Sequence, residues 1–359
     1  MNNYPVYLVY PVKRLYVRFL NSEEDMKIVY VRSYFSAFKT LYDYLEDAFR
    51  RAGHEVFPFD FRSYGIPYRI RKYNKFLDNV GIYKINREFS RLVENVKPDM
   101  LFMLHGFTIH ENVLKDLKER FKFISVNWLC DYPKEYELAC RYAPLFDHFF
   151  VSGTDALKRL RLSGHKNVNL LMFACEPRYH KPVELSPEER EKYASDICFI
   201  GSMYPGRLRM LEKISDFDIA IWGPRWNDIP SDSPLKPLVR GGSLDMEEWV
   251  KAYAATKIVL NNISSFAPYV DNMMNTRTFE ILACRKFQLV DTRDDVLMHF
   301  TSGSELVCYS SIEELRHLFV YYLEHTDEAM NIADKGYSKA LQFHTYDHRV
   351  KEIMNVIKG

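Results

Sequence analysis

The stretch Asn275–Cys284, N-T-R-T-F-E-I-L-A-C, decides the fold together with the run K-F-Q-L-V-D that follows it at Lys286–Asp291. An amide or hydroxyl side chain before two apolar helical turns is a typical cap, so we expect a helix to start at Asn275 or Thr276. The apolar run after this helix predicts a buried strand that ends in an acid.

The first turn of this helix has the chemistry of an anion site. The unpaired N–H groups at a helix start attract negative charge, and Arg277 lies beside them. Glu280 comes one turn later, where a carboxylate can accept two hydrogen bonds from a ribose diol. An amphipathic helix with an ordinary surface Arg and Glu fits the same spacing, so the rest of the chain has to decide between the two.

Strands and helices alternate on both sides of this stretch. Apolar runs predict strands at 27–31, 54–59, 98–104, 121–128, 148–152 and 168–173, and again at 197–200, 218–222, 257–260, 287–290 and 306–309. Near-continuous apolar strands that alternate with helices are typical of parallel sheets covered on both faces. The fold class is therefore α/β, with two doubly wound domains in tandem.

Composition marks the domain boundaries. Residues 181–195 are rich in Pro, Glu, Arg and Lys, which predicts a linker between an N-terminal domain (1–180) and a second domain (196–340). Residues 341–359 are predicted to form a final helix after a break near Phe343–Asp347. Residues 1–25 carry prolines and basic residues within an apolar run, which argues against a signal peptide and for an N-terminal extension.

The overall composition excludes several function classes. The chain has 359 residues, 47% of them hydrophobic, and a net charge of +1, so nothing indicates a nucleic-acid partner or an anionic membrane surface. Apolar runs stay short of the ~18 residues that a membrane helix needs. The six cysteines lack C-x-x-C spacing, which predicts reduced core residues in a cytoplasmic protein.

Two motifs resemble phosphate or metal sites and fail on inspection. Gly201–Leu208 nearly fits a P-loop, but Leu208 cannot hold magnesium, so an NTPase is excluded. Gly201 still lets a diphosphate or sugar approach the backbone. Asp216-Phe217-Asp218 is a D-x-D motif, which in some proteins holds a metal–nucleotide complex. Here it lies at the amino end of a predicted strand, so a helix-to-strand turn explains it better. The histidines lack zinc spacing, so no metal is expected.

Ligands of doubly wound sheets bind beyond the carboxyl ends of the strands. In the first domain, His105 and Asp131 each follow a predicted strand, and either could act as a general base. The alternative for His105 is a hydrogen-bonded histidine in a loop. The alternative for Asp131 is the N-cap of the helix that follows it. In the second domain, the strand ends carry small or polar residues, namely Gly201, Ser202, Gly223, Asn261, Asn262 and Asp291. The helix start at Asn275 falls on the same edge, because this helix runs antiparallel to its strand.

These residues together resemble the CgeB-like group of GT-B glycosyltransferases. The resemblance rests on Asp196–Ser202 with Arg207, on Ile221–Gly223, on Trp249–Asn262 and most strongly on Arg277–Cys284. It covers residues 196–358 well and extends more loosely to 127–131 and 174–182. It implies two Rossmann-like domains that face a cleft, with a C-terminal helix crossing back to the first domain.

The resemblance also implies separate jobs for the two domains. The C-terminal domain would bind a nucleotide diphosphate sugar, and the N-terminal domain would bind the acceptor. Glu280 would hold the ribose, and Arg277 with the helix start would meet the diphosphate. The implied donor-binding residues are Gly201, Ser202, Arg207, Gly223, Asn275, Thr276, Arg277 and Glu280.

Two residues depart from the family pattern. Arg285 stands where the family usually has Gly, so the turn there is expected to differ. Asn272 stands eight residues before Glu280, where many GT-B enzymes have an acid that contacts the transferred sugar.

The implied function is metal-independent transfer of a sugar from a nucleotide diphosphate donor to an unidentified hydroxyl acceptor on a glycan, protein or small molecule. If the reaction inverts, Asp131 or His105 would supply the base, and the sequence does not decide this. A non-catalytic nucleotide-sugar or glycan-binding protein of surface-polysaccharide or spore-coat assembly is the alternative, and an epimerase is a weaker one.

Overall fold

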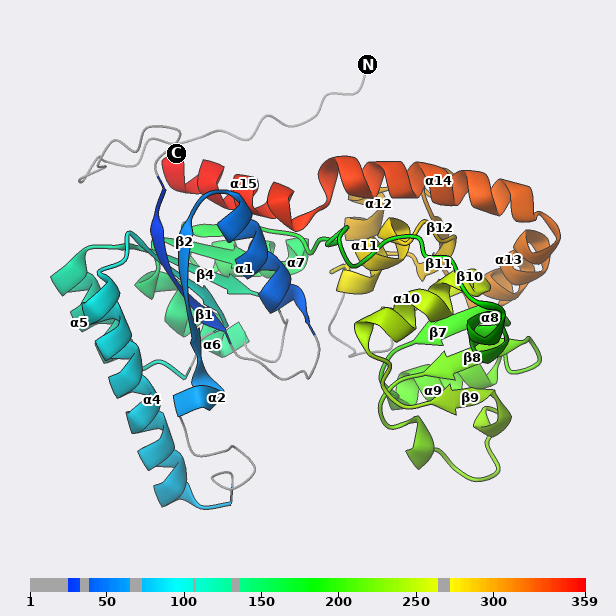
Figure 1. Cartoon of the computed structure of the whole chain (residues 1–359), viewed down its shortest axis with the longest axis horizontal. Helices are drawn as coiled ribbons and strands as arrows, with labels where there is room; N and C mark the ends of the chain where they lie inside the picture. The colour runs from blue at the N-terminus through cyan, green and yellow to red at the C-terminus, as the bar shows by residue number, and fades with distance from the viewer. Residues whose placement is uncertain (1–24, 33–38, 65–72, 106–107, 131–135, 264–271) are drawn as a thin grey trace.

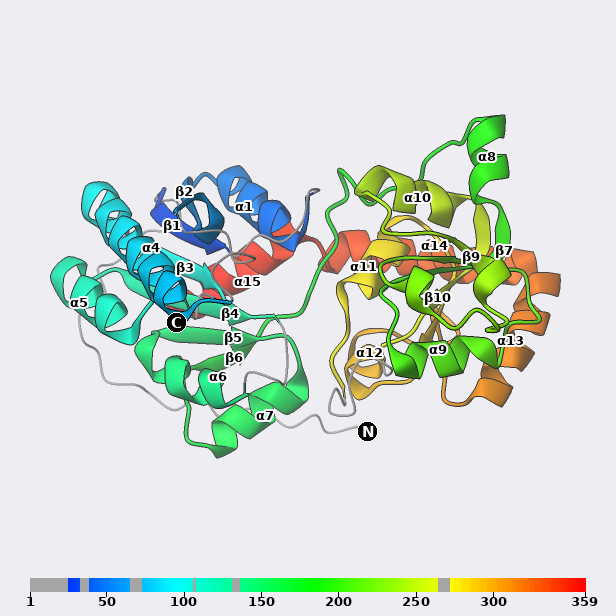
Figure 2. The ribbon, with the colours of Figure 1, turned by 90° about the horizontal axis from the view of Figure 1, so that it is seen from below.

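The computed structural model describes residues 25–32, 39–64, 73–105, 108–130, 136–263 and 272–359. Within these ranges the chain forms two six-stranded parallel sheets, one in each of two lobes that lie side by side (Figures 1 and 2). The predicted α/β class with two doubly wound sheets is confirmed. In the described part of the chain, no helix has the length and apolar character needed to cross a membrane.

The N-terminal lobe holds a sheet with the strand order β2-β1-β3-β4-β5-β6. Tyr30 and Phe102 stack at 5.7 Å on the face covered by α1, while Val31 and Met103 pack on the opposite face. The strands are β1 (Lys27–Arg32), β2 (Glu55–Asp60), β3 (Met100–Leu104), β4 (Ile124–Leu129), β5 (His148–Val151) and β6 (Val168–Leu170). The helices are α1 (Leu41–Arg51), α2 (Phe61–Tyr64), α4 (Lys75–Val96), α5 (Glu111–Phe121), α6 (Tyr136–Tyr142) and α7 (Thr154–Leu162).

The C-terminal lobe holds a sheet with the strand order β12-β11-β10-β7-β8-β9. Helices α9 and α13 cover one face and α10 and α11 the other. The strands are β7 (Ser195–Ile200), β8 (Ile219–Trp222), β9 (Val239–Gly241), β10 (Thr256–Asn261), β11 (Gln288–Asp291) and β12 (Val307–Tyr309). The helices are α8 (Pro187–Tyr193), α9 (Pro205–Glu212), α10 (Met246–Ala254), α11 (Thr276–Ala283), α12 (Asp294–His299) and α13 (Ile312–Glu324).

Two helices at the end of the chain tie the lobes together. Helix α14 (Thr326–Phe343) packs on α11, and α15 (Tyr346–Lys358) crosses to the N-terminal lobe, where it packs on α1 (Figure 1). Between them, Thr345 forms a β-bridge with Cys175. The buried side chain of Arg349 donates hydrogen bonds to the carbonyls of Met172 and Phe173. The chain therefore returns to its first lobe through a hydrogen-bonded contact.

The structure corrects several predicted boundaries and adds two elements. Phe121 ends α5 instead of starting β4, which begins at Ile124, and β6 ends at Leu170. Strand β9 and helix α12 were not predicted. The expected extension at 1–25 lies almost wholly outside the described residues.

The turn after α11 places Arg285 in a left-handed backbone conformation. Arg285 has φ +56°, the left-handed conformation that glycine adopts most easily. Its guanidinium forms an ion pair through Nε and Nη2 with Asp334 of α14. Arg285 itself thus takes up the strained conformation and anchors its side chain on the next helix, and the difference from the turn of the family stays a prediction.

Candidate functional site

The strand order of the C-terminal lobe places a topological switch point between β7 and β10. These two strands are neighbours in the sheet, but the chain leaves them toward opposite edges, and a crevice at such a switch point is where doubly wound sheets bind ligands. Gly201 and Ser202 follow β7 at this place, and Asn262 follows β10. The structure thus brings the predicted polar strand ends to one edge.

Arg207 of α9 reaches this switch point and is only 3% exposed. Its Nη1 donates to the carbonyl oxygen of Ser202 at 2.9 Å, and its Nη2 donates to that of Asn262 at 3.0 Å. Its Nε is buried without a hydrogen-bond partner. Burial, and then the nearby charge of Arg277, lowers the pKa of Arg207 to about 9, so the guanidinium is still charged at neutral pH.

Arg277 of α11 approaches the same point from the other side of β7. Its Nη1 donates to the carbonyl oxygen of Ile200 at 2.6 Å, and burial lowers its pKa. A Cβ atom placed on Gly201 would lie 2.7 Å from Nη1 of Arg277 and 3.2 Å from Nη1 of Arg207. Among the described residues, neither guanidinium forms an ion pair with a carboxylate. Two cations therefore converge on Gly201, and the described carboxylates that act on them, Glu280 and Asp291, lie beyond ion-pair distance.

The loop after β7 is held by its neighbours. Gly223 has φ +139°, and a Cβ atom there would lie 2.2 Å from the carbonyl oxygen of Gly201. The buried Trp226 donates from its indole Nε1 to the same oxygen at 2.7 Å. Glycine is thus required at 223 for close packing of two loops, and Trp226, whose role the sequence did not reveal, fixes the loop in place.

Asn275 is the cap of α11. Its Oδ1 accepts a hydrogen bond from the N–H of Thr278 at 3.0 Å, and its Nδ2 donates to Oδ1 of Asn261 at 2.9 Å. This side chain is therefore occupied in fixing the helix start, and its contribution to a ligand would come through the N–H groups of the first turn, which begins at Thr276.

Glu280 lies one turn further along α11 and is 8% exposed. Burial raises its pKa to about 7, while Arg277 and a hydrogen bond from Thr276 act in the opposite direction. Burial, followed by the charge of Glu280, raises the pKa of Tyr44 in α1 and of Tyr346 in α15. Glu280 therefore faces the junction with the N-terminal lobe.

Of the two candidate bases in the N-terminal lobe, the structure describes one, His105. His105 follows β3 at the switch point between β1 and β3 and has φ +60°. A non-glycine residue in this conformation is strained, and such strain clusters at functional sites. Asn127 holds the backbone there by donating from Nδ2 to the carbonyl oxygen of His105 at 2.8 Å. Asp131 lies outside the described residues.

The motifs rejected on sequence grounds have structural roles. Asp216 forms an ion pair with Arg316, and Asp218 accepts a hydrogen bond from the N–H of Asp196. Asn272 accepts one from the N–H of Asp294 at the start of α12, at 3.4 Å. Within the described ranges, no three His, Cys, Asp or Glu side chains are grouped so as to hold a metal ion.

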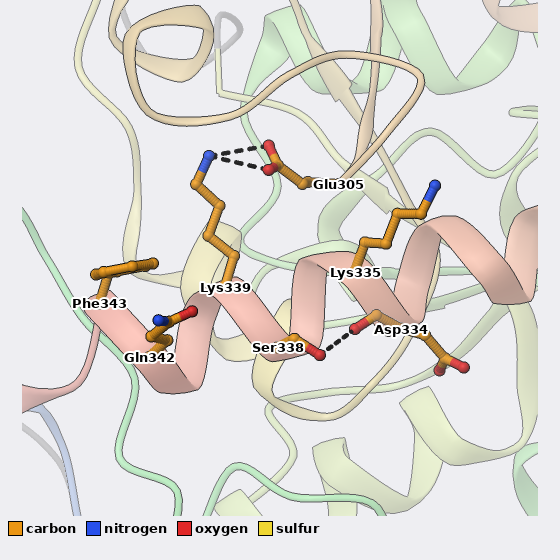
Figure 3. A pocket seen from close by; sticks show the side chains of 7 residues that line it. All are labelled: Glu305, Asp334, Lys335, Ser338, Lys339, Gln342 and Phe343. Carbon is orange, nitrogen blue, oxygen red and sulfur yellow. Dashed lines mark hydrogen bonds and ion pairs between the residues drawn. The ribbon is translucent and has the colours of Figure 1, made fainter.

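An open hollow of about 520 Å³ lies along α14, away from these strand ends (Figure 3). Lys339 pairs there with Glu305 at 3.0 Å, and Asp334 pairs with Arg285. Its third charged side chain on α14, Lys335, is exposed to solvent, so the hollow lacks the buried cations that lie beside Gly201. The lining residues are Glu305, Asp334, Lys335, Ser338, Lys339, Gln342 and Phe343.

Two comparisons with known sequences show what this chain is similar to. Residues 207–355 match the family described as glycosyl transferase-like. The spore protein CgeB of Bacillus subtilis is 24% identical over 271 residues, which cover 71% of this chain and 81% of CgeB. The predicted resemblance to CgeB-like GT-B proteins is thereby confirmed. Both Arg207 and Arg277 lie inside the matched region.

Solved structures similar to this chain share its fold. HepE of Anabaena in complex with UDP-glucose has a TM-score of 0.64 at 12% identity, over 92% of this chain and 99% of HepE. Sucrose-phosphate synthase of Thermosynechococcus elongatus has a TM-score of 0.67 at 11% identity, over 92% and 98%. A glycosyltransferase of Rickettsia africae has a TM-score of 0.65 at 12% identity, over 93% and 98%. The two-lobed fold is therefore GT-B.

Proposed function

We propose that the protein is a glycosyltransferase that moves a sugar from a nucleotide diphosphate donor to a hydroxyl acceptor. The observation that carries this proposal is the convergence of Arg207 and Arg277 on Gly201 at the switch point of the sheet. Burying two like charges side by side is costly unless an anion completes the site. A diphosphate supplies that anion, and the first turn of α11 adds N–H donors to it.

The same two arginines would provide the catalytic stabilisation. Negative charge builds up on the diphosphate as the glycosidic bond breaks, and fixed cations in a water-poor site stabilise it. A guanidinium group can also donate two parallel hydrogen bonds to the oxygens of one phosphate. We therefore propose that the reaction needs no divalent cation, which is supported by the engagement of Asp216 with Arg316 and of Asp218 with the Asp196 backbone.

Glu280 would hold the nucleoside by accepting hydrogen bonds from the ribose diol. Its position one turn beyond Arg277 suits a ribose attached to a diphosphate at the helix start. HepE was solved with UDP-glucose, and an α-glucosyltransferase with a similar fold was also solved with UDP-glucose. A uridine diphosphate sugar is therefore the first donor to test.

The N-terminal lobe would supply the acceptor side of the reaction. His105, held at positive φ at the strand edge, is our candidate general base if the sugar is inverted, and Asp131 is the second candidate. We place this activity in the cytoplasm, because all six cysteines are free thiols, as is usual in a reducing compartment.

Incubation with uridine diphosphate sugars, without metal and with EDTA, tests the proposal. We expect the melting temperature to rise with the matching donor and the donor to be consumed, slowly by water and faster with an acceptor. Saturable binding without turnover across a panel of acceptors would instead support the non-catalytic alternative. If EDTA abolishes the activity, the proposal of metal independence is contradicted, and the proposal of glycosyl transfer is not.

A further inference from the structure

The outward face of α4 carries exposed aromatic side chains at the tip of the N-terminal lobe. Phe76 is 72% exposed, Tyr83 68% and Val80 41%, and spacings of four and three residues place them on one side of the helix. Tyr73, just before the helix, is 80% exposed. Figure 1 shows that the start of α4 projects beyond the rest of the lobe. We call these four residues the α4 stripe.

The α4 stripe is not a face that the lobe needs for its own core. The opposite side of the helix is already buried against the sheet through Ile85, Phe89 and Val93. Large apolar side chains that are exposed together, on a helix whose core face is complete, mark an interaction site.

Cations continue the line of the α4 stripe toward the end of the helix. Arg87 and Arg91 follow Tyr83 at spacings of four, with side chains 47% and 57% exposed, and the exposed Lys84 lies beside them. Glu88 pairs with both arginines from the flank. Glu94 lies on the same line and pairs with Arg120, which also pairs with Asp116 of α5. Four cations (Lys84, Arg87, Arg91 and Arg120) against three carboxylates (Glu88, Glu94 and Asp116) leave this face with a small local positive charge.

We propose that the α4 stripe docks the protein on an anionic lipid surface. The aromatic tips would enter the headgroup layer, where Tyr and Phe are favoured, and the cations would meet the lipid phosphates. A stable dimer usually buries about 800 Å² on each partner. The α4 stripe is a single projecting helix wide, which suits a flat lipid surface better than a second copy. The proposal does not depend on the proposed function.

Vesicle flotation with the full chain tests this inference. We expect binding to phosphatidylcholine vesicles that contain phosphatidylglycerol, weaker binding to phosphatidylcholine alone, and release by added salt. The double variant Phe76→Ser/Tyr83→Ser should lower the partition coefficient at least about tenfold, and Lys84→Gln about fivefold. Leu162→Ser, at a residue 79% exposed on α7, is the matched control and should bind like the wild type.

Three results would overturn the inference. The wild type could fail to bind anionic vesicles, or the Phe76→Ser/Tyr83→Ser variant could bind them as well as Leu162→Ser does. A dimer in sedimentation equilibrium that only the double variant loses would assign the α4 stripe to a second copy. All four side chains are exposed, so the variants should fold, which unchanged circular dichroism would verify.

Discussion

Asp295 of the C-terminal lobe caps a helix of the N-terminal lobe. It is fully buried and accepts hydrogen bonds from the backbone N–H of Thr154, at 3.1 Å, and from the Thr154 hydroxyl. Thr154 is the first residue of α7, whose own cap position is Gly153 and has no side chain to offer. A carboxylate at a helix start is well placed to satisfy unpaired N–H groups. The two lobes are thus joined at the edge where their strands end, as well as through α15.

Removing this contact should loosen the lobes without unfolding either one. Asp295→Ala and Thr154→Val should each widen the distribution of distances between fluorophores placed on the two lobes, by weakening a contact worth about 1 kcal/mol. The two effects should be less than additive, because both variants break the same interaction. Asp294→Asn, on the exposed neighbour, is the control. Unchanged distances in both variants would show that the contact does not hold the lobes.

Glu280 should make nucleotide binding dependent on pH. A ribose diol donates to the ionised carboxylate, so the affinity for UDP should fall by up to about tenfold per unit as pH drops below about 7. Glu280→Gln should bind UDP weakly and with little pH dependence in calorimetry. An affinity of the wild type that does not change between pH 6 and pH 8 would remove Glu280 from the ribose site.

The ionised carboxylate of Glu280 should destabilise the folded protein when no ligand is bound. Its pKa is raised from 4.5 in the unfolded chain to about 7, so the stabilisation that it gives is complete below about pH 4.5 and is lost as pH rises through 7. Glu280→Gln should therefore have a higher melting temperature than the wild type at pH 8, and the difference should shrink at pH 5. A lower melting temperature at pH 8 would contradict this.

Gly201 should be needed for the position of the two guanidinium groups. A methyl group at 201 meets the flexible ends of Arg277 and Arg207, so Gly201→Ala should fold but bind UDP at least about tenfold more weakly. Gly223→Ala clashes with backbone and should also lower the melting temperature. Gly242→Ala, where no atom lies within 4 Å of the added methyl group, is the control. Calorimetry and thermal unfolding of the three variants separate these effects.

Arg349 should contribute to the stability of the fold and not to the binding of UDP. Its guanidinium bonds to the carbonyls of Met172 and Phe173 and to Nδ1 of His344, so Arg349→Met leaves buried acceptors unpaired. We expect a loss of about 3 kcal/mol in the free energy of unfolding, measured in urea. Glu352→Gln removes only its half-exposed partner and should cost under about 1 kcal/mol. Equal losses in both variants would refute the role of the buried bonds.

Local patterns predicted the framework of the fold well. The expected strands at 27–31 and 197–200 are observed as β1 and β7, because an apolar run marks each of them. Strand β9 has three residues and α12 has six, which is too short for periodicity to show. Arg285 takes a left-handed conformation that no propensity for arginine predicts.

The candidate site was predicted in part. Arg277 and Glu280 could be named because the helix start itself indicates an anion site. The convergence of Arg207 with Arg277 depends on the crossing of the chain between β7 and β10, which only the folded sheet shows. Trp226 and Asp295 act through contacts far away in the sequence, and nothing near them in the chain indicates these roles.

The most direct test of the central claim is the affinity for UDP of arginine variants, measured by calorimetry in EDTA. Arg207→Met and Arg277→Met should each weaken binding at least about thirtyfold, because a charged hydrogen bond is worth ~2 kcal/mol. Arg209→Met, on the exposed face of α9, should leave the affinity unchanged. Affinities of Arg207→Met and Arg277→Met equal to that of Arg209→Met would show that the diphosphate binds elsewhere.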